Sequence, residues 1–119
     1  MTHYLYLASN DELPENLIEF GSSVKEDEMK TEQNKYIFQY ELHYELKISE
    51  LNKAAVLLRE YLESNPYNII EIIYGLSSNR EPCVVKEKES IKINQLTGKL
   101  MYDLKMDSML EVRGRKYLL

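Results

Sequence analysis

Apolar and polar residues alternate most regularly between Tyr36 and Ile48. Successive side chains of a β-strand point to opposite faces, so this alternation predicts one long strand. Its apolar face carries Tyr36, Phe38, Tyr40, Leu42, Tyr44, Leu46 and Ile48. Its polar face carries Gln39, Glu41, His43, Glu45 and Lys47. We therefore expect a sheet with one buried side and one solvated side.

A helix is predicted directly after this strand, from Ser49 to about Ser64. Apolar residues recur there at helical spacing and form one stripe, which should pack on the tyrosine-rich face of the strand. Ser49 is the predicted N-cap, because its hydroxyl can accept a hydrogen bond from a first-turn N–H group. Asn65-Pro66 should end the helix, since proline disfavours helical geometry in the residue before it. The stripe consists of Leu51, Ala54, Ala55, Leu58, Tyr61 and Leu62.

Other segments predict further strands. Asn68 to Leu76 is almost entirely apolar and rich in β-branched residues, which is typical of a central strand covered on both faces. His3 to Ala8 precedes turn-forming residues and predicts the first strand, and Met109 to Val112 predicts the last. The run from Cys83 to Ile93 becomes mostly charged, which suits an exposed sheet edge.

Two segments are less regular. From Asn94 to Met106 the apolar spacing fits a helix, although Thr97-Gly98-Lys99 also fits the turn of a hairpin; we favour the helix. Asp11 to Lys35 is polar, and its second half predicts a solvated acidic loop at about residues 21–35. Its first half holds one helical turn of apolar residues, namely Leu13, Leu17, Ile18 and Phe20.

Together these elements predict a single α+β domain over residues 1–119, with a mostly antiparallel sheet and one or two helices packed on one face. From Tyr36 onward the order is strand, helix, two strands, helix, strand, which is that of the split βαβ or ferredoxin-like arrangement. The N-terminal strand would be an addition to it. A chain of 119 residues is long enough to bury one core.

Charge narrows the range of partners. The net charge is −5, but the segment from Asn10 to Asn34 alone carries −6, so the acidity is local. A negative protein repels nucleic-acid phosphates and anionic lipids, so we expect neither nucleic acid nor membrane as a partner. The chain has a single cysteine, Cys83, which we interpret as a core residue rather than a nucleophile. With no apparent signal peptide or membrane span, the expected location is the cytoplasm.

No motif predicts a cofactor. The glycines are too far apart for a phosphate-cradling loop, and one cysteine with two histidines cannot supply a structural zinc cage. A basic cluster near the end of the chain contains Arg113, Arg115, Lys116 and Tyr117, which fits either an RNA-binding surface or a solvated terminus.

Two sets of residues are candidate ligand-binding sites. Glu41, His43 and Glu45 would lie in a row on one strand face, about 7 Å apart along the strand, where carboxylates could tune an imidazole or complete a metal site. The same row fits the solvated face of an amphipathic strand. The second set follows the predicted central strand and fits either a ligand-binding loop or a plain turn; it contains Ser77, Ser78, Asn79 and Arg80.

The leading functional hypothesis is a non-enzymatic acidic protein-binding module, such as a regulatory, inhibitor or immunity-type partner. Glu26, Asp27 and Glu28 would steer it toward a basic protein surface. The alternative is a small-molecule- or metal-binding domain, or a small enzyme, that uses one of the two candidate ligand sites. A homodimer formed through an exposed strand edge or the polar face of the sheet is the third hypothesis.

Overall fold

A computed structural model of the chain describes residues 3–24, 36, 38–43, 45–76 and 85–117. It contains one six-stranded sheet in the order β2-β3-β1-β4-β6-β5. The strands are β1 (His3–Ser9), β2 (Gly21–Ser23), β3 (Phe38–Leu42), β4 (Ile69–Leu76), β5 (Glu87–Lys92) and β6 (Ser108–Arg113). The helices are α1 (Ile48–Ser64) and α2 (Gly98–Tyr102), with 3-10 turns η1 (Glu15–Glu19) and η2 (Ile93–Gln95). The predicted α+β class is confirmed.

The N-terminal strand occupies the middle of the sheet. β1 pairs antiparallel with both β3 and β4, so β3, α1 and β4 form a split βαβ unit with β1 in the gap. β6 pairs antiparallel with β4 and parallel with β5, its direct neighbour. The sheet therefore combines one split unit with one adjacent parallel pair, and β1 is integral to it rather than an addition to a ferredoxin-like arrangement.

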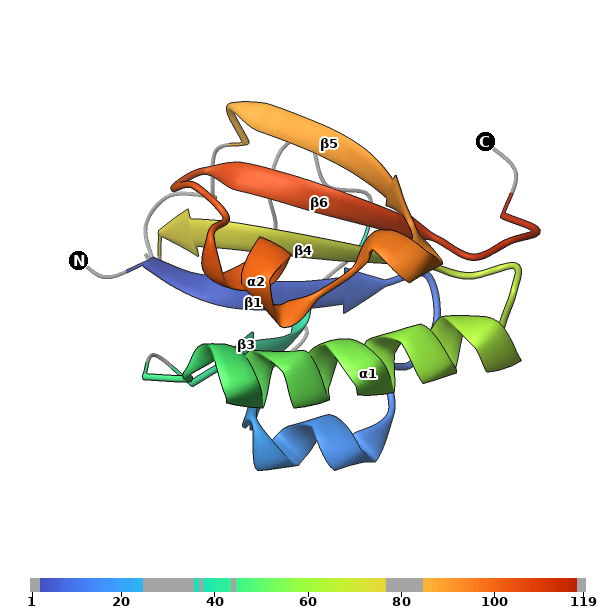
Figure 1. Ribbon diagram of the computed structural model, residues 1–119, viewed down its shortest axis with the longest axis horizontal. Coiled ribbons are helices and arrows are strands. Elements are labelled where there is room, and N and C mark those ends of the chain that lie inside the picture. The colour runs from blue at the N-terminus through green and yellow to red at the C-terminus, as the bar shows by residue number, and fades with distance from the viewer. Residues whose placement is uncertain (1–2, 25–35, 37, 44, 77–84, 118–119) are drawn as a thin grey trace.

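The helices cover one face of the sheet, as Figure 1 shows. The predicted stripe of α1 is confirmed, because Leu51, Ala54, Ala55, Leu58 and Leu62 are all buried. Burying one such leucine side chain stabilises the fold by about 2 kcal/mol. The facing sheet residues are Leu7, Tyr40, Leu42, Ile70, Ile72, Leu110 and Val112.

The start of α1 differs from the prediction. The helix begins at Ile48, its N-cap is Lys47, and Ser49 lies inside the first turn. The backbone N–H of Lys47 donates a hydrogen bond of 3.2 Å to the Glu50 carboxylate. The Glu50 side chain thus caps the N-terminus of α1, as the Glu of a capping box does.

The long strand predicted from Tyr36 to Ile48 is shorter, because β3 spans only Phe38–Leu42. Its pairing with β1 also shifts by one residue, with Leu7 opposite Tyr40 and Ala8 opposite Phe38. Such a β-bulge places one extra residue on the strand and reverses the alternation beyond it. Tyr36 therefore packs with a smaller cluster on the other face, around Tyr6, Ala8, Ile73 and Met109, and not under α1.

The segment after β5 is helical, as favoured from the sequence. Gly98 is the first residue of α2, and the Thr97 hydroxyl accepts a hydrogen bond from the N–H of Leu100. A Cβ atom at Gly98 would lie 2.3 Å from the backbone nitrogen of Asn52, so glycine permits α2 to touch α1.

The remaining predicted strands are confirmed within the described residues: β1 and β6 match closely, β4 is central, and β5 is a charged edge. The expected apolar turn forms η1, with Leu13, Leu17 and Phe20 buried and Ile18 exposed. The predicted acidic loop at about residues 21–35 is wrong at its start, because Gly21–Ser23 form strand β2, which pairs with β3. The part of that loop beyond Val24 lies outside the described residues, and so does Cys83. In the described chain, no helix has the length and apolarity needed to cross a membrane.

Candidate functional site

A groove of about 850 Å³ opens at the end of the sheet where β1 begins and β4 ends. One wall is the segment that leads from β3 into the first turn of α1, and the other includes α2 and the residues after it. It is lined by His3, Tyr4, Leu5, His43, Glu45, Leu46, Lys47, Ile48, Ser49, Leu51, Tyr74, Met101, Tyr102 and Leu104.

The groove has an apolar floor and a polar rim. Leu51 and Met101 are fully buried at its base, and Leu5, Leu46 and Leu104 are half-buried and pack on the same core. All residues of the rim are exposed. Its polar members are His43, Glu45, Lys47 and Ser49, and its large apolar members are Ile48 and Tyr102. An apolar cavity of several hundred Å³ with a few polar groups is typical of small-molecule sites.

His3 is fixed in the wall of this groove. Its Nε2 lies 3.3 Å from the Asp107 carboxylate, and its ring lies 5.4 Å from that of Tyr74. The Asp107 carboxylate also forms an ion pair with Lys86 Nζ at 3.5 Å. The backbone of Asp107 has a positive φ of 62°, a conformation that aspartate tolerates better than most residues. Asp107 therefore holds His3 in place, and His43 is the more exposed imidazole of the two.

The first turn of α1 supplies hydrogen-bond donors to one end of the groove, and it also contains the capping carboxylate of Glu50. The first N–H groups of a helix have no partner within the helix, and the helix dipole adds partial positive charge there. Lys47 precedes this turn and Ser49 lies in it, and both line the groove. A cation, a hydroxyl and helical N–H groups thus meet at one place beside the apolar floor.

The structure separates the three residues that the sequence placed in one row. His43 and Glu45 line the groove, but they lie beyond the end of β3. Glu41 lies on the strand opposite Tyr6 and is not among the lining residues. The row is broken because the chain leaves the sheet after Leu42 to reach α1.

The other predicted site residues cannot be placed. Ser77, Ser78, Asn79 and Arg80 lie outside the described residues, and so do Glu26, Asp27 and Glu28. Among the residues that are described, no three of Asp, Glu, His and Cys lie close enough together to hold a metal ion.

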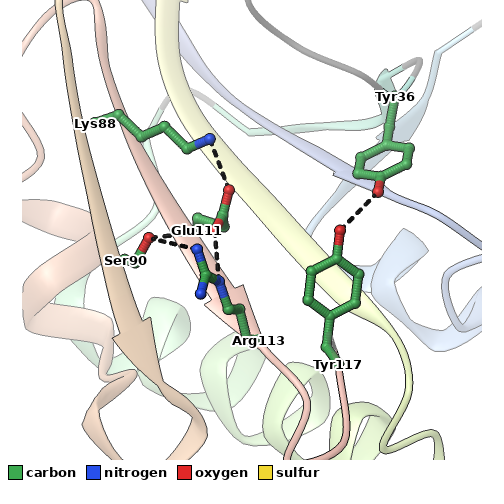
Figure 2. A network of polar contacts seen from close by, with 6 residues as sticks. All are labelled: Tyr36, Lys88, Ser90, Glu111, Arg113 and Tyr117. Carbon is green, nitrogen blue, oxygen red and sulfur yellow. Dashed lines mark hydrogen bonds and ion pairs between the residues drawn. The ribbon is translucent and has the colours of Figure 1, made fainter. Parts of the chain in front are cut away.

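A second polar feature lies on the sheet face away from α1. Glu71 on β4 and Glu111 on β6 are paired across the strands and are only 2% and 3% exposed. Figure 2 shows the groups around Glu111: Lys88 Nζ and Arg113 Nε each lie 2.7 Å from its carboxylate, and the Ser90 hydroxyl donates to it at 3.2 Å. Burial raises the pKa of Glu111, but these two cations outweigh burial and hold it below its usual value.

Two tyrosines complete this feature. The hydroxyls of Tyr36 and Tyr117 are 3.2 Å apart (Figure 2). This hydrogen bond, together with burial and the negative charges of Glu71 and Glu111, raises the pKa of Tyr36 to about 12. Tyr36 is thus held neutral beside the two carboxylates.

Sequence reasoning passed over Glu71 and Glu111, although a signal was present. Each is a single charge inside an apolar run, Ile69 to Ile73 and Met109 to Val112. A lone carboxylate in a buried strand needs partners to offset its desolvation, so such a residue indicates a polar cluster.

No family model matches this chain, and no curated protein or solved structure matches it either. What the protein does is therefore inferred from its own side chains.

Proposed function

We propose that this protein binds a small amphipathic molecule, one with an apolar body and a single anionic head group, in the groove between the start of α1 and α2. The observation that carries the proposal is the position of the first turn of α1, with its N–H groups, Lys47 and Ser49, directly beside the apolar floor of a groove of about 850 Å³.

The floor supports binding of the apolar body. Leu5, Leu46 and Leu104 are only half-buried, so a ring or short chain placed over them removes further apolar surface from water. Each Å² removed contributes about 25 cal/mol. Tyr102, which is 56% exposed, would close over one side of the bound molecule.

The first turn of α1 supports binding of the head group. Anions are stabilised at helix N-termini by the N–H groups and the dipole, and Lys47 and the Ser49 hydroxyl add a charge and a donor. His43 supplies a further donor on the same rim. Glu45 also lies on this rim and Glu50 lies in the first turn, so a molecule with one negative charge fits better than one with several.

The test is a titration with 3-phenylpropionate and with its neutral amide, followed by ¹H–¹⁵N NMR. We expect the acid to shift the N–H signals of Ile48 and Ser49 and to bind more tightly than the amide. Lys47→Ala should weaken binding of the acid by about fivefold, the size of one exposed charge contact, and leave the amide unaffected. Lys53→Ala, an exposed lysine of α1 outside the groove, is the control.

Equal affinity for acid and amide would rule out the anionic head group. Absence of shifts at the groove residues with either compound at saturating concentration would rule out the proposed function.

A second candidate is the acidic protein-binding module, favoured by the described part of the acidic segment. Asp11, Glu12, Glu15 and Glu19 are all exposed there, and Ile18 on η1 is 63% exposed among them. Burial raises the pKa of Tyr40, and the charges of Glu15 and Glu12 raise it further, so these acids lie near β3. An exposed apolar side chain within an acidic surface fits a partner with an apolar pocket in a basic surface.

This candidate is tested by affinity capture from extract of the native host, with three baits side by side. A basic protein that binds the wild type and the control Glu60→Gln, but not the combined Ile18→Ser, Glu15→Gln and Glu19→Gln variant, would support it. Retention of the same proteins by all three baits would remove the η1 surface from consideration, and neutralising Glu26, Asp27 and Glu28 would then test the remaining acids of that segment.

A further inference from the structure

A second groove, of about 710 Å³, lies at the end of the sheet opposite the first. β5 and β6 are parallel neighbours, so their carboxyl ends meet at the same edge and bring the segments that follow them together. These segments are η2 and the turn from Gly114 to Tyr117. The turn is fixed by N–H groups of Gly114 and Lys116, which donate at 2.8 Å to the carbonyls of Asn68 and Pro66.

The charged residues that line this groove are three cations, Lys92, Arg113 and Arg115, and one acid, Glu63. The lining thus carries an excess of positive charge, opposite in sign to the protein's net charge of −5. The structure places three of the four residues of the C-terminal basic cluster, Arg113, Arg115 and Tyr117, beside a lysine from β5. Lys116 is turned away and lies 5.6 Å from the centre of the Tyr67 ring.

Both guanidinium groups are held in position by carboxylates. Arg113 donates from Nε to the buried Glu111 at 2.7 Å, and Figure 2 shows its side chain beside Ser90. Arg115 donates from Nη2 to both carboxylate oxygens of Glu63, at 3.0 and 2.7 Å. Since each guanidinium has five N–H donors, such a pair orients the group and leaves further donors for a ligand.

Uncharged polar groups and an aromatic ring complete the lining. Ser90, Asn94 and Gln95 supply a hydroxyl and two amides, and Tyr117 adds a half-buried ring whose hydroxyl is anchored by Tyr36 at 3.2 Å. Planar guanidinium groups match the oxygens of a phosphate, and an aromatic face can stack on a planar ring.

We propose that this groove binds a small phosphate-bearing molecule, with Arg113, Arg115 and Lys92 on the phosphate oxygens and Tyr117 against the rest of the ligand. Lys92 is exposed, and the two arginines keep further N–H donors beside their carboxylate partners, so the several oxygens of a phosphate ester suit this groove better than a single carboxylate does. A long polyanion suits the site less well, because Glu87 and Glu89 lie exposed along the same edge strand and would repel an extended phosphate backbone. The lysines that alternate with them, Lys86 and Lys88, are already paired with Asp107 and Glu111. This site is separate from the groove at the start of α1 and does not depend on the function proposed for it.

The test uses three probes at low ionic strength: pyrophosphate, AMP and citrate, the last being a carboxylate anion of comparable charge. Binding is followed by calorimetry and by ¹H–¹⁵N NMR, including the arginine Nε signals. We expect pyrophosphate and AMP to shift Lys92, Gln95 and Arg115, and to bind at least about tenfold more tightly than citrate, because of the match between guanidinium and phosphate.

The decisive variants are Arg115→Ala and Lys92→Ala, since Arg113 also supports the buried Glu111. We expect affinity for pyrophosphate to fall about tenfold in the first and about fivefold in the second. Lys53→Ala removes the same charge from α1 outside the groove and should leave affinity unchanged; circular dichroism checks that all three fold. The proposal would be overturned if pyrophosphate and AMP failed to bind, if citrate bound equally well, if the shifts lay elsewhere on the surface, or if Lys53→Ala lost as much affinity.

Discussion

Glu71 and Glu111 are single carboxylates within apolar strands, and the pairing of β4 with β6 places them opposite each other. Like charges at opposed positions destabilise a sheet, and burial adds to this effect. Lys88 and Arg113 compensate at Glu111, where both cations lie within 2.7 Å of the carboxylate. At this site the ionised form is the favoured one, as its lowered pKa indicates.

We predict that Glu111→Gln lowers the free energy of unfolding at pH 7 by about 1–3 kcal/mol, the size of hydrogen bonds to a charged group. Because the pKa of Glu111 is lower in the folded than in the unfolded protein, its contribution is present above the unfolded-state pKa and is lost as pH falls through the folded-state pKa. The difference between variant and wild type should therefore shrink in acid. Urea unfolding measured from pH 7 downward checks this.

The control for this prediction is Glu89→Gln, which removes the same charge from an exposed position of the adjacent strand. It should change stability by less than about 0.5 kcal/mol. If both variants behaved alike, or if the effect of Glu111→Gln did not change with pH, the ion pairs would not be stabilising the fold.

At the scale of the element, α2 shows how a short helix is positioned by packing against a longer one. It spans only Gly98–Tyr102, too short to be stable alone. The N–H of Gly98 donates to the Asn52 side chain at 2.8 Å, and the missing Cβ lets the two helices touch. Met101 and Tyr102 of α2 line the first groove, so this contact also sets the position of one of its walls.

Gly98→Ala should therefore lower the free energy of unfolding by about 1–3 kcal/mol, as overpacking does, even though alanine is the better helix former by about 1 kcal/mol. It should also weaken binding of 3-phenylpropionate in the first groove. Thermal unfolding and the NMR titration measure the two effects. Lys99→Ala, at the next and exposed position, is the control, and a Gly98→Ala protein as stable as this control would contradict the assigned contact.

At the scale of the whole molecule, the sheet separates two unlike sites. The first groove lies where β1 begins, beside the start of α1, and the second lies where β5 and β6 end, beside Glu63 near the end of α1. The strand order decides which residues line each groove. The first groove has the N-terminus of α1 beside apolar side chains, and the second has arginines at and after the end of β6. The described acids of the Asn10 to Val24 segment are exposed and lie in neither lining.

Sequence patterns predicted most elements because local periodicity reports which residues are buried. The stripe of α1 and the apolar run of β4 both needed only spacing to be recognised. The same reasoning failed at Tyr36, because a bulge at the pairing of Leu7 and Ala8 reverses the alternation of β3 and depends on the partner strand. It also failed at Ser49, since the N-cap lies two residues earlier, at Lys47.

The sequence by itself determined the α+β class, the helix that ends at about Ser64, the central place of β4 and the charged edge. These follow from propensities and spacing within single segments. Only the tertiary structure decided that β1 fills the gap between β3 and β4, that Glu71 meets Glu111, and that His43 and Glu45 share a groove with residues of α2. Such contacts join residues far apart in the chain, and their geometry depends on strand order, which no local pattern encodes.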